Sequence, residues 1–167
     1  MATLPIENYK ANIAASVVEN TVTLVQGETG SGKTTQVPQY LYKLLPKYRN
    51  KFIGVTQPRR VAAMTLAQRV AEEMDSKLGG LVGYRVRFEE RLSEKTRIKF
   101  VTDGMLLREA IIDPDLSKYG IVVVDEAHER SVASDVLLSL LKDIAKRRKG
   151  FRIVVMSATL DVPKFQS

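Results

Sequence analysis

Short apolar runs alternate along the chain with longer amphipathic stretches. Five runs are built mostly from apolar and β-branched residues and end at polar or turn-forming residues, a pattern typical of buried strands. Because these runs are apolar at consecutive positions, they favour a parallel sheet that is covered on both faces. The predicted strands are Thr21–Gln26, Lys51–Thr56, Arg97–Thr102, Gly120–Asp125 and Arg152–Met156.

Helical spacing fills the intervals between these strands. Pro38 must fall in the first turn of its helix or kink it, because proline lacks the amide hydrogen that an interior turn needs. Apolar residues recur three or four positions apart in Thr34–Leu45, Arg59–Met74, Gly104–Ile112 and Ser131–Arg148. A further packing helix within residues 1–20, with Pro5 at its start, is predicted by the apolar positions Ile6, Tyr9, Ile13 and Val17.

Strands that alternate with helices place the chain in the α/β class. We therefore expect a mostly parallel β-sheet with helices on both faces. The chain has 167 residues and shows no internal repeat, linker or low-complexity tract. This length suits one domain spanning residues 1–167.

Composition narrows the functional classes. No run of about 18 apolar residues occurs, so no membrane span is expected, and the N-terminus MATLPIENYK contains no apolar signal region. The absence of cysteine excludes disulfides and thiolate metal sites. The net charge of +7 suits either a polyanionic partner or solubility. Basic residues gather in Tyr84–Phe100 and in Lys146–Lys149, and the second cluster is typical of a solvated helix end.

A glycine-rich segment, GETGSGKT at residues 27–34, matches the pattern G-x-x-x-x-G-K-[ST] between a predicted strand and a predicted helix. Its glycines let loop amides turn inward around phosphate oxygens at the positive end of a helix dipole. Lys33 is placed for the β- and γ-phosphates and the Thr34 hydroxyl for Mg²⁺, which favours a nucleoside triphosphate over a dinucleotide. The predicted nucleotide-binding residues are Gly27, Glu28, Thr29, Gly30, Ser31, Gly32, Lys33, Thr34 and Thr35.

Two adjacent carboxylates, Asp125 and Glu126, stand at the end of the fourth predicted strand. A Mg²⁺-bound triphosphate needs a second metal anchor, and hydrolysis needs a group that orients water. We assign Asp125 to the metal, through a bound water, and Glu126 to the attacking water, as base or orienter. Successive strand residues point in different directions, so neighbouring carboxylates can divide these roles. The expected catalytic residues are Lys33, Asp125 and Glu126.

His128 is the only histidine in the chain. A zinc-protease pattern needs a second histidine, and the chain also lacks the cysteines of other zinc sites. A zinc site is therefore disfavoured. A general base and a purely structural histidine both stay open, although Glu126 lies nearer the expected water.

Five segments occur in a fixed order, namely GETGSGKTTQVPQ, TQPRRVAA, TDGMLLRE, DEAHER and SAT. In order and spacing they resemble the DEAH-box family of RNA helicases, over nearly the whole chain. The resemblance implies a RecA-like domain that binds ATP, or another nucleoside triphosphate, together with Mg²⁺. It also implies that the strand ending at Ser157 lies between the phosphate-loop strand and the DEAH strand.

The resemblance implies further roles around the nucleotide. Arg69 matches an arginine that stacks on the adenine base. Ser157 and Thr159 match residues that lie near the γ-phosphate and link its state to domain movement. His128 becomes a coupling residue that reaches a second domain, so we expect it to be partly exposed in this chain and short of its partner.

RNA contacts are implied at two of the matching segments. TQPRR and TDGML match segments that hold the RNA backbone through phosphates without reading sequence. The segment Gly83–Glu89 also looks like the family, and its strand is expected to extend an edge of the sheet. The expected RNA-binding residues are Arg59, Arg60, Thr102 and Asp103.

The family pattern continues with a second RecA-like domain and with C-terminal winged-helix and helical-bundle domains, which we expect to be absent from this chain. The chain is then an ATP-binding domain that binds nucleotide but hydrolyses it slowly alone. RNA and the further domains are its expected partners, and the sequence does not identify which protein activators it has. The alternatives are a DNA-directed DExH helicase and a nucleotide-dependent interaction switch without unwinding. A nuclear or nucleolar location is favoured, with the cytoplasm as the alternative.

Overall fold

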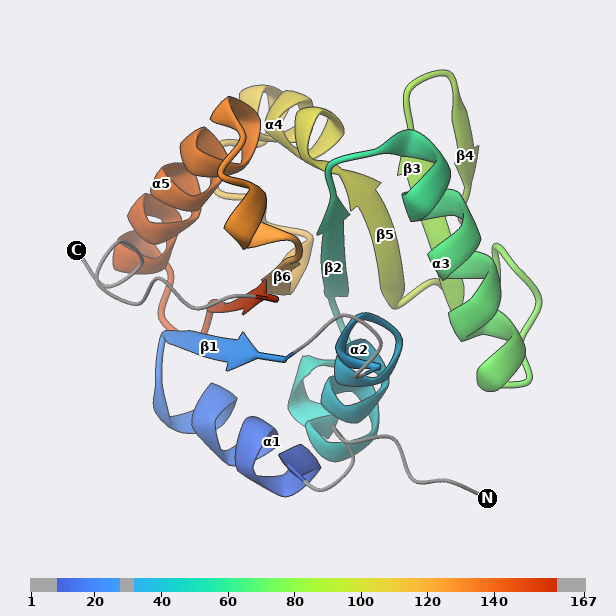
Figure 1. The fold of residues 1–167 in the computed structure, drawn as a ribbon, viewed down its shortest axis with the longest axis horizontal. Helices are drawn as coiled ribbons and strands as arrows, with labels where there is room; N and C mark the ends of the chain where they lie inside the picture. The colour runs from blue at the N-terminus through green and yellow to red at the C-terminus, as the bar shows by residue number, and fades with distance from the viewer. Residues whose placement is uncertain (1–8, 28–31, 159–167) are drawn as a thin grey trace.

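The computed structural model describes residues 9–27 and 32–158 (Figure 1). Its helices are α1 (Lys10–Glu19), α2 (Lys33–Leu44), α3 (Arg60–Glu73), α4 (Asp103–Ile112) and α5 (Val132–Arg147), with 3₁₀ turns η2 (Pro46–Tyr48) and η3 (Ala127–Glu129). Its strands are β1 (Val22–Gln26), β2 (Phe52–Gln57), β3 (Val82–Val86), β4 (Glu89–Arg91), β5 (Ile98–Thr102), β6 (Tyr119–Val124) and β7 (Arg152–Ser157).

The strands form one sheet in the order β1-β7-β6-β2-β5-β3-β4. Every pair is parallel except β3–β4, which is antiparallel. β7 lies between β1 and β6, as the resemblance implied. The β3–β4 hairpin extends the sheet beyond β5, so the edge expected from the segment Gly83–Glu89 is also present.

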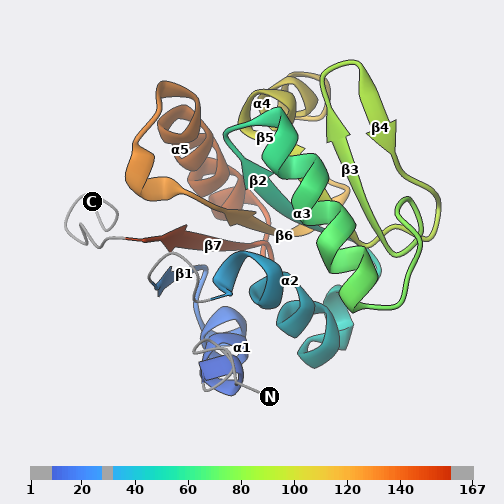
Figure 2. The same ribbon diagram turned by 45° about the vertical axis from the view of Figure 1, so that its right-hand side comes forward.

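Helices cover both faces of this sheet (Figure 2). Alternate residues of a strand point to opposite faces, and in β6 Val123 joins the core with α1, α2 and α3. Val122 joins the core with α4 and α5. Each fully buried aliphatic side chain of this kind contributes about 1.5–3 kcal/mol. The predicted α/β fold, with a mostly parallel sheet and helices on both faces, is confirmed.

Three local features differ from the sequence expectation. Pro38 lies beyond the first turn of α2, so it removes one backbone hydrogen bond while the helix continues to its end. β4 was not predicted. The basic cluster after α5 is not only solvated. The Arg148 guanidinium donates to the carbonyls of Asp115 and Leu116, in the connection between α4 and β6, and of Tyr119 at the start of β6.

The basic stretch Tyr84–Phe100 is also partly internal. Lys99 is buried and donates to the Glu109 carboxylate at 2.9 and 3.1 Å, and Arg85 donates to the same group at 3.2 Å. These two cations therefore tie β5 and β3 to α4. Across the described ranges, no helix is long and apolar enough to cross a membrane.

Candidate active site

The carboxyl ends of β1, β7, β6 and β2 meet at one edge of the sheet, because these strands are parallel neighbours. Ligands of open α/β sheets bind in the crevice outside this edge. The Gly27 amide donates to the Ser157 carbonyl at 3.1 Å, so the start of the glycine-rich segment is joined to the end of β7. This edge thus gathers Gly27 and the end of the glycine-rich segment from Gly32, together with Ser157 and the two carboxylates.

Helix α2 begins where the glycine-rich segment ends. Its N-cap, Gly32, has a φ of 87°, a left-handed conformation that favours glycine over residues with a side chain. The first amides of a helix lack intrahelical partners and stand at the positive end of its dipole, which attracts anions. Lys33 is the first residue of the helix, and its side chain is buried. The local geometry therefore has the features that a phosphate site needs.

Asp125 is 1% exposed, and both of its carboxylate oxygens are held. Its Oδ2 accepts from the Thr34 hydroxyl at 2.8 Å and from Gln57 Nε2 at 2.6 Å. Its Oδ1 accepts from the Glu126 amide at 2.8 Å. Thr34 precedes Asp125 by 91 positions, so this contact joins the two predicted halves of the site through the fold.

Thr34 and Asp125 fit a magnesium ion in their chemistry. A hydroxyl and a carboxylate are the hard oxygen ligands that Mg²⁺ prefers, and Mg²⁺ keeps several waters when a protein supplies only one or two ligands. Among the described residues no cluster of three or more acidic, histidine or cysteine side chains could enclose a metal. That donor set suits a metal shared with phosphate oxygens.

Glu126 leaves the line of β6 because its backbone is left-handed, with φ 60° and ψ 32°. Such a conformation is strained for a residue with a side chain and is found most often at functional sites. Burial raises the pKa of its carboxyl, and the neighbouring Asp125 raises it further, while His128 and Lys33 oppose the shift. A raised pKa makes Glu126 a better proton acceptor near neutral pH.

His128 is partly exposed, at 25% of its side chain, as expected. Its expected partner in a second domain stays a prediction, and the ring has contacts of its own within this domain. Its Nδ1 accepts a hydrogen bond from the Ala158 amide at 3.1 Å, and its Nε2 lies 3.2 Å from Glu126 Oε2. The ring therefore links the end of β7 to Glu126 within this domain.

Gln57 is a site residue that sequence reasoning missed. It is buried at the end of β2, beside β6, and donates to the Asp125 carboxylate. A buried carboxylate is stabilised by each donor that replaces lost water. Its position directly after a predicted strand was the available signal, but nothing in the sequence says that β2 and β6 are neighbours.

The three arginines predicted to bind the nucleotide base or RNA are exposed, and each contacts another residue of this chain. Arg69 is 68% exposed and contacts Glu73, four positions later, at 3.2 Å. Arg59 contacts Glu129 at 2.6 Å, and Arg60 donates to the Arg87 carbonyl at 3.3 Å. These three side chains lie where a ligand can reach them.

The side chains of Thr102 and Asp103 do not lie free at the surface, where a direct contact with an RNA phosphate would need them. The Thr102 hydroxyl caps α4 by accepting from the Met105 amide at 3.3 Å. The Asp103 side chain is 3% exposed, so the prediction that it contacts RNA is not supported by its position. Burial, and then Asp125 and Glu129, raise the pKa of Asp103 to about 6, against the effect of the Thr56 hydroxyl. A buried carboxyl is not a group that binds a polyanion.

Some predicted site residues lie outside the described ranges. Five of them carry no structural statement and keep the roles predicted from sequence, namely Glu28, Thr29, Gly30, Ser31 and Thr159.

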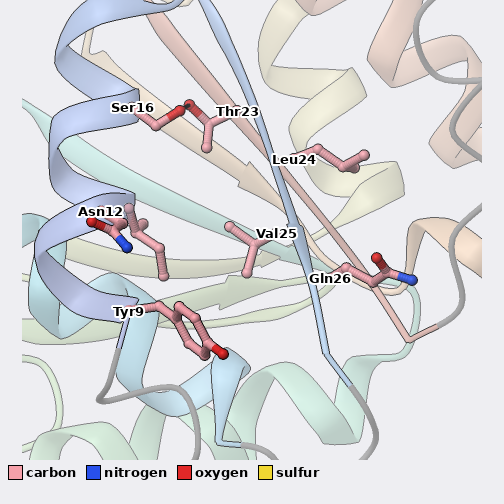
Figure 3. Close-up of a pocket in the computed structure, with 8 residues that line it drawn as sticks. Tyr9, Asn12, Ser16, Thr23, Leu24, Val25 and Gln26 are labelled. Atoms are coloured by element: carbon pink, nitrogen blue, oxygen red, sulfur yellow. Dashed lines mark hydrogen bonds between the residues drawn. The ribbon is translucent and has the colours of Figure 1, made fainter.

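A cavity of about 350 Å³ lies between α1 and β1 (Figure 3). Tyr9, the N-cap of α1, Asn12 of α1 and Val25 of β1 contribute to its wall. The Ser16 and Thr23 hydroxyls are 3.1 Å apart beside it. None of the predicted site residues lines this cavity. The candidate site is therefore the carboxyl edge of the sheet and not this cavity.

Comparison with known families adds a separate observation. Residues 8–166 match the family model described as DEAD/DEAH box helicase. The match spans the glycine-rich segment, the carboxylates and the SAT segment. It agrees with the position of these three segments at one edge of the sheet.

Proposed function

Since the chain belongs to the DEAD/DEAH box helicase family, we propose that it is the ATP-binding domain of an ATP-dependent RNA helicase of the DEAH-box subfamily. The sequence Asp125-Glu126-Ala127-His128 supports this subfamily. The domain couples the binding and hydrolysis of Mg²⁺-ATP to the binding and remodelling of RNA.

The observation that carries this proposal is the 2.8 Å hydrogen bond between Thr34 and Asp125. It places the start of the phosphate-binding helix beside the carboxylates that follow β6. Hydrolysis of a nucleotide needs the start of the phosphate-binding helix and these carboxylates close enough to act on the same phosphate group.

The residues divide the chemistry as follows. The amides at the start of α2 and the Lys33 ammonium bind the β- and γ-phosphate oxygens. Thr34 and Asp125 would hold Mg²⁺, which would neutralise phosphate charge when bound. Glu126 orients a water and accepts its proton as the water oxygen bonds to the γ-phosphorus and the bond to ADP breaks. Gln57 keeps Asp125 in place.

Two further roles follow from the positions of exposed and edge residues. The Arg69 guanidinium offers a flat cationic face for the adenine base. Ser157 ends β7, and His128 accepts a hydrogen bond from the adjacent Ala158 amide at 3.1 Å, so both lie at the carboxyl edge of the sheet. We assign Ser157, Thr159 and His128 to the coupling of nucleotide state to domain movement.

RNA is proposed as the polymer because the TQPRR and TDGML segments resemble RNA-helicase segments. Arg59 and Arg60 are exposed at the start of α3, at the carboxyl edge of β2, and can contact phosphates. Thr102 stands at the neighbouring strand end.

The choice between RNA and DNA is tested by ATP turnover of the full-length protein with single-stranded RNA or DNA of one sequence and length. We expect RNA to raise the rate more than DNA does. Equal or greater stimulation by DNA would support the DNA-directed alternative. Nucleotide-dependent partner exchange without strand separation would support the interaction switch. A single RecA-like domain is expected to turn over ATP slowly by itself, because an arginine finger from a second domain contributes about 10³–10⁵ in rate.

A further inference from the structure

A hydrogen-bonded cluster centred on Glu73 joins α3 to the phosphate-binding helix α2. Glu73 Oε1 accepts from Gln36 Nε2 at 2.7 Å and from Gln39 Nε2 at 3.0 Å. Its Oε2 accepts from Arg69 Nε at 3.2 Å. One carboxylate thus holds two amides of α2 and the exposed guanidinium of α3.

The Nε2 atom of each glutamine makes a second hydrogen bond besides the one to Glu73. Gln39 Nε2 also donates to the Thr35 carbonyl at 2.9 Å, and Gln36 Nε2 reaches the Thr35 hydroxyl at 3.2 Å. Turning either amide round would set its oxygen against the Glu73 carboxylate. Since Gln36 and Gln39 are buried, the side of the cluster that faces α2 is rigid.

The charge of Glu73 suits this position. Burial raises the pKa of its carboxyl, but the hydrogen bonds from Gln39, Gln36 and Arg69 more than offset that effect, so its pKa lies below the ordinary value. The adjacent Glu72 differs, because among the described residues its side chain accepts from Gln68, at 2.9 Å, on the exposed side of the same helix and has no bond to α2. The two neighbouring glutamates therefore form a natural comparison.

Arg69 is restrained at one nitrogen and stays open elsewhere. Its side chain is 68% exposed, and a free arginine loses rotamer freedom when a ligand fixes it. A bond at Nε removes part of that freedom in advance and leaves the flat face of the guanidinium open. Such preorganisation strengthens binding without adding a contact.

We propose that Glu73 is a positioning residue for the nucleotide base. It holds Arg69 at a fixed place relative to α2, the helix whose first turn binds the phosphates. The base and the phosphates of the nucleotide are then bound by one rigid unit made of α2, Glu73 and Arg69. This inference rests on the nucleotide site proposed above and concerns only its base half.

The test compares a ligand that has a base with one that has none. Calorimetry gives the dissociation constants of Mg²⁺-ADP and Mg²⁺-pyrophosphate for the wild type and for Glu73→Gln. We expect Glu73→Gln to weaken Mg²⁺-ADP about two- to five-fold, the range of an exposed cation–π contact, and to leave Mg²⁺-pyrophosphate unchanged. Arg69→Ala removes the guanidinium itself and should cause at least this loss, and the double variant should lose no more than Arg69→Ala alone. Glu72→Gln is the matched control and should change neither ligand.

Equal weakening of both ligands by Glu73→Gln would overturn the proposal, because Glu73 would then only brace α2. Unchanged Mg²⁺-ADP affinity, or losses that add in the double variant, would also overturn it. Thermal unfolding of each variant checks that the fold is intact. The nucleotide site itself is judged separately, by whether Lys33→Ala weakens Mg²⁺-pyrophosphate.

Discussion

Lys33→Ala is expected to weaken Mg²⁺-ATP binding by about 10- to 100-fold, the value of one hydrogen bond to a charged group. The lysine is buried at the first position of α2, beside the Glu126 and Asp125 end of the site. Removing its ammonium takes away the direct cationic contact to the β- and γ-phosphates, while the backbone amides remain. Calorimetric titration of Mg²⁺-ATP into both proteins measures the change.

A second lysine on the same helix provides the control. Lys43 is exposed in the last turn of α2, far from the phosphate end. Lys43→Ala should leave the affinity unchanged, and both variants should keep the cooperative thermal unfolding of the wild type. If Lys33→Ala bound Mg²⁺-ATP as well as Lys43→Ala does, the phosphate site would have to lie elsewhere.

Glu126→Gln has the second large expected effect, a fall in kcat of about 10²–10⁴ in the full-length enzyme, the range for loss of a general base. Glutamine keeps the size and the hydrogen-bonding oxygen of the side chain but cannot accept the proton of the attacking water. Because the carboxylate acts only on that water, nucleotide affinity should stay the same. Steady-state turnover with RNA, combined with nucleotide titration, separates the two quantities.

Glu126→Asp refines the same experiment. It keeps the charge but withdraws the carboxylate by one methylene, so we expect a smaller loss than for Glu126→Gln. Turnover by Glu126→Gln within a few-fold of the wild type would rule out the assigned role and return His128 to consideration as the base.

The fold was accessible from the sequence because its strands carry strong signals. The run Val122–Val124 is apolar at every position, which occurs when a strand is buried on both faces. β4 has only the residues Glu89–Arg91 and pairs by backbone bonds at the sheet edge, so no apolar pattern marks it. Periodicity therefore predicts the covered part of the sheet and misses its edge.

The sequence predicted the chemical groups of the site better than it predicted the contacts between residues that lie far apart in the chain. The pattern of Gly32, Lys33 and Thr34 specifies a local backbone, and the structure has that local geometry. Gln57 and Glu73 escaped notice because their roles depend on which strands and helices are neighbours. The partner of His128 escaped for the same reason, since the Ala158 amide is 30 positions away.

The central claim is that a magnesium nucleotide binds at the carboxyl edge of the sheet. The most direct measurement is a two-dimensional amide NMR titration of this chain with Mg²⁺-ADP. The account predicts the largest shifts at Gly32, Lys33, Thr34 and Asp125, and little change around the cavity between α1 and β1. Shifts concentrated at that cavity, or no shift at the carboxyl edge under saturating Mg²⁺-ADP, would contradict it.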